Sequence, residues 1–225
     1  MIGVSATMCM LPDRYPESLA CVMSLKGQVD KIYLCLNGFQ EVPEALKEDW
    51  MEVVYIGENI GAVGRYTKLP MVEGDLISCD DDLVYPPSYV QDFSKESKQT
   101  PMKVLTHHGK YITNRRFTMA AHCLKRNEKR DMVQILGAGV SFFPHATTYL
   151  LSEVMSMPQN PTDIHVSALC YREGIGMRLV PHTADYFKYI PPPKGTTIWD
   201  TETSLPSFSS LVKKVCDGYN VDLYE

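Results

Sequence analysis

The sequence lacks the long apolar run that a membrane-spanning helix requires. Such a helix needs roughly 18 to 20 apolar residues, and no stretch of this chain approaches that length. The N-terminal stretch MIGVSATMCM also lacks the basic region of a secretory signal peptide. The seven cysteines are odd in number and include no CxxC pair, which suits a reducing compartment better than a disulfide framework. These absences predict a cytoplasmic protein with no membrane span.

The sequence also lacks an excess of positive charge. Its net charge is -5 and its isoelectric point is near 5.7, which argues against a sequence-independent nucleic-acid binder. The one basic cluster, Leu124 to Arg130, is short and contains a glutamate. We therefore expect no nucleic-acid partner. The 225 residues are 44% hydrophobic, enough to bury the core of one large α/β domain or two small ones.

Apolar runs alternate with helical patterns in the first half of the chain. We expect strands at residues 2–6, 31–36, 53–56, 75–79 and 103–108, with helices between them. Continuous apolar strands separated by helices predict a parallel sheet that is covered on both faces. Ligands then bind beyond the carboxyl ends of the strands.

The second half is less regular. We expect a strand pair within residues 132–143, helices at 147–157 and 161–174, and a last strand at 177–181. Thr162 is a candidate cap of the second helix. The tail reads as a proline-rich linker that begins near Ile190, followed by a terminal helix at 207–219.

Three aspartates, Asp80 to Asp82, follow the apolar strand at 75–79. Carboxylates at a strand end favour a hard divalent cation, because oxygen ligands suit Mg²⁺ or Mn²⁺ and the cation relieves their mutual repulsion. A cation held by one or two carboxylates usually completes its coordination with phosphate and water. The pattern therefore predicts a phosphorylated or nucleotide-linked substrate.

Five stretches together resemble the glycosyltransferases of the GT-A fold, which are nucleotide-sugar enzymes with an Asp-x-Asp motif. They are IGVSATM, GENIGAVGRYTKL, DLISCDDDLVYPP, PTDIHVSALCY and RLVPH. The narrower similarity is to the small glycosyltransferases that large algal (chlorella) viruses encode for their capsid glycans. The resemblance covers roughly residues 1 to 190.

The resemblance implies a Rossmann-like α/β fold with a mixed, mostly parallel central sheet flanked by helices. Residues 1–190 would form one domain, with a nucleotide-sugar-binding half at 1–100 and an acceptor-binding half at 101–190. Residues 191–225 would be the linker and the C-terminal helix. Fusion to further domains also fits the resemblance.

The implied reaction moves a hexosyl or deoxyhexosyl group from a nucleotide donor, usually UDP-linked, to a hydroxyl of a glycan acceptor. Mn²⁺ or Mg²⁺ would be the cofactor, and a viral enzyme of this kind would act in the host cytoplasm. The sequence leaves open whether the reaction inverts or retains the anomeric carbon.

The resemblance also assigns roles to the aspartates. Asp80 matches the aspartate that faces the ribose and the sugar. Asp82 matches the metal ligand, or Asp81 does if the register is set by Pro86 rather than Pro87.

Two residues from the second half complete the expected site. His182 follows the last core strand, where members of this fold commonly supply a metal-binding histidine. Asp163 matches the catalytic base, and its place near a helix N-terminus favours the ionised form. The family often has two acids at this point, whereas this chain has Thr162-Asp163.

Five residues are candidates for the donor side of the site. Thr7 and Arg14 follow the first strand, where the family holds the base and ribose, and Asn37 ends the second strand. Arg65 and Lys68 lie three residues apart, on one face of a helix, and would approach the base or the diphosphate. We expect His107 and His108 to lie at the end of a strand, where the chain enters a loop.

Three other functions fit parts of the pattern. A haloacid-dehalogenase phosphatase would use Asp80 as nucleophile and Asp82 as acid and base, but it usually carries its nucleophile on the first strand. A sugar nucleotidyltransferase would need a glycine-rich loop after the first strand, which SATMCMLPDRY does not provide. A cation-dependent carbohydrate-binding module would be antiparallel and secreted, which the βαβ pattern opposes.

Overall fold

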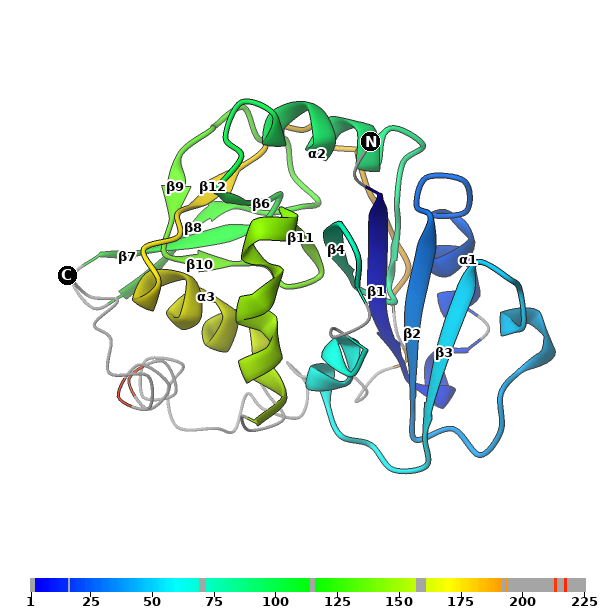
Figure 1. Cartoon of the computed structure of the whole chain (residues 1–225). Coiled ribbons are helices and arrows are strands. Elements are labelled where there is room, and N and C mark those ends of the chain that lie inside the picture. The colour runs from blue at the N-terminus through cyan, green and yellow to red at the C-terminus, as the bar shows by residue number, and fades with distance from the viewer. Residues whose placement is uncertain are drawn as a thin grey trace.

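A computed structural model describes the chain over residues 3–15, 17–68, 72–113, 116–156, 161–191, 193, 213 and 217 (Figure 1). The expected terminal helix lies outside these residues apart from Lys213 and Asp217. Within the described ranges, no helix is both long enough and apolar enough to cross a bilayer.

The first half forms the elements β1 (Val4–Met10), η1 (Pro12–Arg14), α1 (Glu17–Met23), β2 (Lys31–Asn37), η2 (Glu44–Leu46), β3 (Met51–Ile56), η3 (Ala62–Tyr66), β4 (Asp75–Cys79), β5 (Leu83–Val84) and α2 (Tyr89–Ser97). The second half forms β6 (Val104–Thr106), β7 (Gly109–Thr113), β8 (Arg116–Ala121), β9 (Met132–Val133), β10 (Ile135–Leu136), β11 (Val140–Phe143), η5 (His145–Ser156), α3 (Thr162–Arg172), β12 (Met177–Leu179) and β13 (Lys188–Tyr189).

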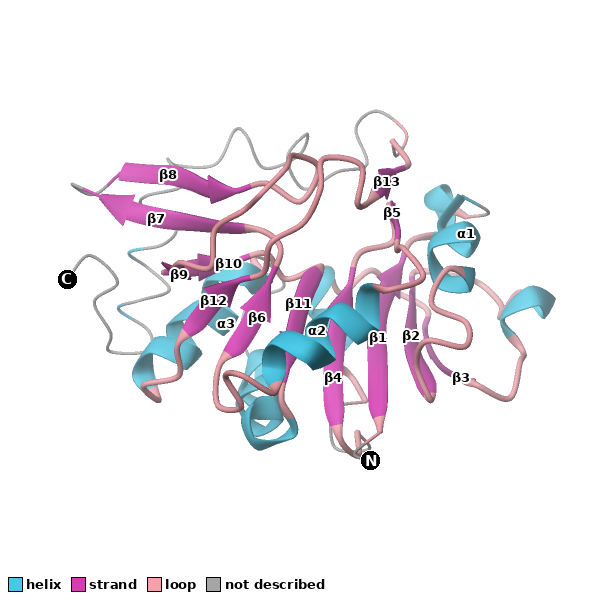
Figure 2. Cartoon of the chain, turned by 90° about the horizontal axis from the view of Figure 1, so that it is seen from above, coloured by secondary structure: helices cyan, strands magenta, loops and turns pink. Residues whose placement is uncertain are grey.

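The central sheet has eight strands in the order β3-β2-β1-β4-β11-β6-β12-β9. The β3-β2-β1-β4 half is parallel throughout, and β11 runs antiparallel to both of its neighbours. The expected α/β fold with a mixed, mostly parallel sheet is therefore confirmed. The carboxyl ends of β1, β2 and β4 meet at one edge of this sheet, which we call the carboxyl edge (Figure 2).

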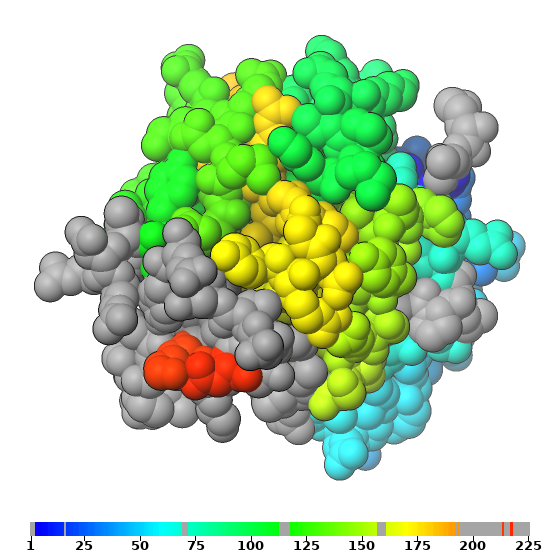
Figure 3. Space-filling model, turned by 60° about the vertical axis from the view of Figure 1, so that its left-hand side comes forward, coloured from blue at the N-terminus to red at the C-terminus, as the bar shows by residue number. Residues whose placement is uncertain are grey.

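Side chains alternate between two apolar layers because successive residues of a strand point to opposite faces. On β4, Leu76 packs into the layer with η3, η5 and α3, whereas Ile77 packs into the layer with α1 and α2. Phe143 and Phe142 of β11 divide in the same way. Figure 3 shows α3 (yellow) beside η5 (yellow-green) on the outside of the first layer. Both faces of the sheet are thus covered.

A β-hairpin that the sequence did not predict follows β6. Strands β7 and β8 pair in an antiparallel ladder, and β10 joins them in a separate small sheet. The expected strand pair within 132–143 is instead three short strands, because β9 and β11 join the central sheet while β10 joins the hairpin. Figure 2 shows the hairpin on the same side of the sheet as β5 and β13.

Three local expectations need correction. The first strand runs to Met10 rather than Ala6, so Thr7 lies inside β1. Pro161 is the N-cap of α3 and Thr162 is the first helical residue, so Thr162 is no cap. The segment that carries Arg65 is a 3-10 helix.

The chain returns to the carboxyl edge after β12. Strand β13 pairs with β5, and the backbone N–H of Ile190 donates to the carbonyl of Asp82 at 2.8 Å. Beneath it, Phe187 packs edge-on against Tyr85 and Tyr89. The segment from the far end of the chain thereby holds the loop that contains the three aspartates.

Candidate metal and nucleotide-sugar site

The three aspartates begin where β4 ends, between β1 and β11. The backbone N–H of Asp80 contacts the carbonyl of Gly139 at 3.2 Å and the hydroxyl of Tyr85 at 2.7 Å. The same hydroxyl donates to the Gly139 carbonyl at 2.9 Å. Tyr85 is buried, so this network fixes the direction in which the chain leaves β4.

Gly139 leaves room for the carboxylate of Asp80. A Cβ atom at position 139 would lie 1.7 Å from Oδ2 of Asp80, far inside any possible contact distance. The glycine is therefore required by close approach, and the Asp80 side chain lies directly against the backbone of the neighbouring strand.

Arg65 holds Asp80 from the opposite side. Nη2 of Arg65 lies 2.9 Å from Oδ1 of Asp80, and Nη1 approaches the Cys79 carbonyl at 3.3 Å. The guanidinium is 8% exposed. Burial opposes its charge, but the Asp80 carboxylate outweighs burial and raises the pKa of Arg65. A permanently charged arginine thus offsets the first aspartate.

Arg14 offsets the second aspartate. Its Nη1 lies 2.7 Å from Oδ1 of Asp81, and the hydroxyl of Ser18 donates to Oδ2 at 3.3 Å. Burial raises the pKa of Asp81, while Arg14 acts in the opposite direction. Both oxygens of Asp81 therefore face partners from η1 and α1.

Asp82 has no such cation. Among the described residues, no hydrogen bond or ion pair is formed by its side chain, and burial together with the charges of Asp80 and Asp81 raises the pKa of Asp82 to about 7. Two arginines facing three carboxylates leave one negative charge uncompensated. A divalent cation would relieve that excess, and the oxygen ligands of Asp80 and Asp82 are those that Mg²⁺ and Mn²⁺ prefer. The residues present thus fit the expected cation.

The other donor-side candidates organise the backbone around this cluster. The Thr7 hydroxyl donates to the carbonyl of Arg65. The Asn37 amide donates to Asn59 Oδ1 at 2.8 Å and to the Gly61 carbonyl at 3.1 Å. Both residues are almost fully buried and brace the turn that positions η3.

Lys68 lies apart from the aspartates. Its Nζ is 3.7 Å from Oε1 of Glu52 on β3, so the structure pairs it with the outer strand of the sheet. Its expected role at the base or diphosphate remains a prediction, and Arg65 alone of the two contacts an aspartate among the described residues.

His182 lies beside His107 on the returning segment. The two rings meet edge-on with centroids 5.1 Å apart. Nδ1 of His182 lies 3.0 Å from the Thr183 carbonyl and Nε2 lies 3.3 Å from the His107 carbonyl. Both nitrogens therefore face backbone oxygens in this conformation, and coordination of a cation would require the ring to turn.

Asp163 lies in the first turn of α3. Burial raises the pKa of Asp163, and Lys110 on β7 lowers it; the charges of Asp80 and Arg65 also act on it. The helix N-terminus favours ionisation as expected, but burial has the larger effect and acts in the opposite direction. The structure thus brings this carboxyl group within electrostatic range of the aspartate cluster.

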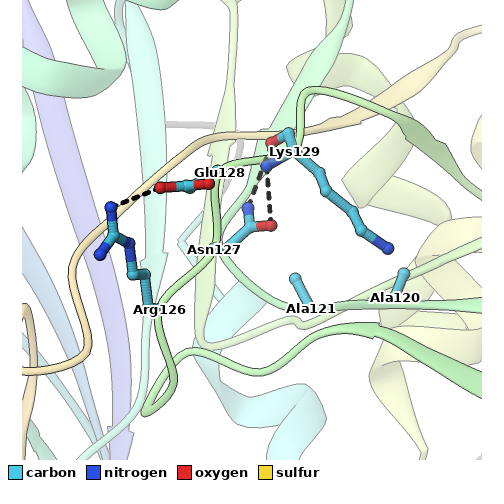
Figure 4. A pocket seen from close by; sticks show the side chains of 6 residues that line it. All are labelled: Ala120, Ala121, Arg126, Asn127, Glu128 and Lys129. Atoms are coloured by element: carbon cyan, nitrogen blue, oxygen red, sulfur yellow. Dashed lines mark hydrogen bonds and ion pairs between the residues drawn. The ribbon is translucent and has the colours of Figure 1, made fainter.

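A surface hollow of about 540 Å³ lies between the end of β8 and residues 126–129 (Figure 4). It is lined by Ala120, Ala121, Arg126, Asn127, Glu128 and Lys129. Figure 4 shows Asn127 bonded to the backbone of Lys129, and Arg126 paired with Glu128. None of the aspartates lines this hollow, so it is separate from the candidate site.

Sequence patterns do not point to Tyr85 or Ser18 as site residues, and they place Gly139 only at a bend between strands. Tyr85 and Gly139 lie against Asp80, and Ser18 lies against Asp81. These contacts follow from the tertiary arrangement of the strands and of α1, which no local pattern contains. The one local feature that points to this contact is Gly139, a glycine directly before β11, the strand that pairs with β4.

Comparison with protein-family models gives no match, and comparison with curated protein sequences gives none either. The fold is similar to the crystal structure of GalNAc-T7 with UDP, GalNAc and Mn²⁺, with a TM-score of 0.63 and 11% identity, over 99% of this chain and 56% of that one. It is also similar to S. aureus TarS 1-349, with a TM-score of 0.60 and 12% identity, over 84% of this chain and 60% of that one. The chain has the GT-A fold.

That likeness concerns the fold. The chain spans less than two thirds of the length of either neighbour. The GT-A fold agrees with the sequence resemblance and with the position of the aspartates at the carboxyl edge.

Gly139→Ala should weaken divalent-cation binding, because the new Cβ displaces the carboxylate of Asp80. We expect at least a tenfold rise in the Mn²⁺ dissociation constant measured by calorimetry. Gly57→Ala is the matched control, since its Cβ would meet nothing closer than 3.9 Å. Equal Mn²⁺ affinity in the two variants would contradict the role of Gly139.

Without divalent cations, the protein should lose stability as pH rises from about 4 to about 7. The folded-state pKa of Asp82 is about 7 against 3.8 unfolded, so the folded state binds the extra proton in this window. The loss should be on the order of 2 kcal/mol, because partial exposure screens the shift. Denaturant unfolding at several pH values measures it.

Asp82→Asn should flatten this pH dependence, and saturating Mn²⁺ should oppose the loss above pH 7 by binding the ionised carboxylate. An unchanged slope in Asp82→Asn would show that Asp82 does not hold the proton.

Proposed function

We propose that this protein is a metal-dependent glycosyltransferase that moves a sugar from a nucleotide donor to a hydroxyl of a glycan acceptor. The observation that carries the proposal is the aspartate cluster at the carboxyl edge of a GT-A fold, in which Asp82 forms no ion pair with an arginine among the described residues. UDP is the proposed nucleotide, supported by the similarity to a structure that contains UDP and Mn²⁺.

Asp82 would hold the cation, which we propose to be Mn²⁺ or Mg²⁺. The carboxylate of Asp80, which would face the ribose and the sugar of the donor, would add its charge to the same site. When bound, the cation would neutralise charge on the departing diphosphate. Asp81 is the weaker of the two alternatives for the metal ligand, because both of its oxygens face Arg14 and Ser18. His182 is the proposed further ligand, once its ring has turned from the two carbonyls.

The arginines would set the position of the aspartates rather than bind the donor directly. Arg65 is fixed by Asp80 and by backbone carbonyls, and Arg14 is fixed by Asp81. Because both guanidiniums are largely buried, they hold two of the carboxylates in position without solvent rearrangement. Thr7 and Asn37 would support the same surface through the backbone of residues 59–65.

Asp163 would be the base of an inverting reaction. In that reaction the acceptor oxygen forms a bond to the anomeric carbon, the bond from that carbon to the diphosphate oxygen breaks, and the hydroxyl proton passes to the Asp163 carboxylate. Burial raises the pKa of Asp163, which makes its carboxylate a stronger proton acceptor, and Lys110 acts on that pKa in the opposite direction. The acceptor would lie between α3 and the hairpin.

The expected cellular role follows from the same resemblance. We propose that the enzyme acts in the cytoplasm, on a growing glycan such as that of a viral capsid. Residues 1–100 would bind the donor and residues 101–190 the acceptor, with the segment after residue 190 as a linker and helix.

Asp82→Asn should abolish cation-dependent turnover of the donor, because the neutral amide is a poor ligand for Mn²⁺. Asp163→Asn should keep UDP binding and reduce sugar transfer by about 10²-fold to 10⁴-fold, as loss of a general base does. Thermal shift with UDP and Mn²⁺ measures binding, and UDP release measures turnover.

Asp13→Asn is the matched control for both variants, since Asp13 is an exposed acid beside Arg14. It should behave as the wild type. Normal turnover in Asp82→Asn would reject the cation role, and normal transfer in Asp163→Asn with an inverted product would reject the base role.

A screen of nucleotide sugars with Mn²⁺ should give both a thermal shift and slow donor hydrolysis with one UDP-sugar. A pyrophosphate product from a sugar phosphate and a nucleoside triphosphate would instead identify a sugar nucleotidyltransferase. Stabilisation by free sugar and Ca²⁺ without turnover would identify a carbohydrate-binding module.

A further inference from the structure

Two histidines and a cysteine gather at the base of the β7–β8 hairpin. His108 immediately precedes β7, and His122 and Cys123 immediately follow β8. The ligand atoms of the three side chains all lie within 4.8 Å of one another. The aspartate chemistry does not use this group, which we call the His-His-Cys cluster.

The hairpin register explains why the cluster forms. Gly109 pairs with Ala121, so His108 and His122 occupy the next cross-strand position beyond that pair. Their rings meet edge-on with centroids 5.0 Å apart. Residues fourteen apart in the chain are thus brought together by strand pairing alone.

The backbone around His108 is held in place by Thr106 at the end of β6 and by Gly137 directly after β10. The N–H of Gly137 donates to the His108 carbonyl at 2.8 Å, and the Thr106 hydroxyl donates to the same carbonyl at 2.7 Å. A Cβ at Gly137 would lie 2.7 Å from Cβ of His108. These contacts therefore fix the position of His108 independently of a bound cation.

We propose that the His-His-Cys cluster binds a borderline or soft divalent cation of the Zn²⁺ type, at a site separate from the aspartate cluster. Imidazole nitrogen and thiolate sulfur are the usual protein ligands of Zn²⁺, and carboxylate oxygens suit Mn²⁺ and Mg²⁺. The two sites thus differ in ligand chemistry. Three protein ligands leave the fourth tetrahedral position to water or to a bound molecule.

The protonation states of the cluster are compatible with a cation. Burial lowers the pKa of His108 to about 4 and also lowers that of His122, which favours the neutral rings that a cation binds. Burial, with the charges of Asp80 and Asp82, raises the pKa of the Cys123 thiol to about 12. The thiol must lose its proton on binding, so one proton is released for each cation bound.

Binding requires one small rearrangement at His122. The N–H of Leu124 lies 3.2 Å from Nδ1 of this ring. Coordination through Nδ1 replaces that contact, and coordination through Nε2 moves the ring proton to Nδ1 and breaks it. The contact is at the long end of the hydrogen-bond range, so its loss has a small cost.

A cation here would fasten the loop after β6 to the segment after β8. The hairpin base lies on the carboxyl-edge side of the sheet (Figure 2), and Asp80 is close enough to influence the pKa of His108 and Cys123. The cluster would therefore stabilise the hairpin beside the proposed acceptor region.

The test uses the full-length protein titrated with Co²⁺ and then Zn²⁺, with saturating Mg²⁺ present to occupy the aspartates. We expect one equivalent of Co²⁺ to give the intense thiolate-to-cobalt charge-transfer absorption, and Zn²⁺ to remove it. Absence of this absorption in the wild type would overturn the proposal.

Three variants make the test specific. Cys123→Ser should lose the absorption and bind Zn²⁺ at least about tenfold more weakly, and His122→Gln should also bind about tenfold more weakly. Circular dichroism checks that both are folded, and His108→Gln replaces any variant that is not. Cys9→Ser, whose thiol lies beside Cys35, is the matched control and should keep the absorption.

Asp82→Asn separates the two sites. It should keep the cobalt absorption while losing Mn²⁺ binding. Loss of the absorption in Asp82→Asn, or its retention in Cys123→Ser, would overturn a separate His-His-Cys site. Neither result depends on whether the protein transfers sugar.

Discussion

The structure of this site depends on the repulsion among three carboxylates at the end of β4. Asp80, Asp81 and Asp82 are adjacent and partly or fully buried, and two arginines face them in the part of the chain that the structure describes. Arg65 from η3 and Arg14 from η1 remove most of the repulsion. Burial and the remaining negative charge raise the pKa of Asp82 to about 7. A divalent cation at Asp82 would relieve the same repulsion that the bound proton relieves.

This electrostatic arrangement explains why distant parts of the chain converge on the carboxyl edge. Tyr85 and Gly139 fix the exit of the chain from β4, and Asn37 braces the turn that delivers Arg65. Ile190 holds the far side of the loop through the Asp82 carbonyl. The aspartates can face one another because these backbone contacts resist the separation that repulsion favours.

The second half of the fold contributes groups of a different kind. Asp163 on α3 and Lys110 on the hairpin are close enough to influence each other electrostatically, and the charge of Asp80 also acts on Asp163. The His-His-Cys cluster lies at the base of the same hairpin. In the proposed function, donor chemistry belongs to the β3-β2-β1-β4 half and acceptor chemistry to the hairpin and α3.

The sequence by itself determined the βαβ order, the buried strand at 75–79 and the acidic strand end, because continuous apolar runs and neighbouring charges are local properties of the chain. It also singled out Arg65, as a residue near the donor, and the structure pairs this arginine with Asp80. It did not predict the hairpin, the short strands within 132–143 or the pairing of β13 with β5, because their pairing partners are distant in sequence and their apolar runs are short. Only the tertiary structure decided which aspartate has no arginine partner among the described residues. It also decided which atoms His182 contacts and that His108 lies beside His122. These outcomes depend on burial and on strand register, which no local pattern contains.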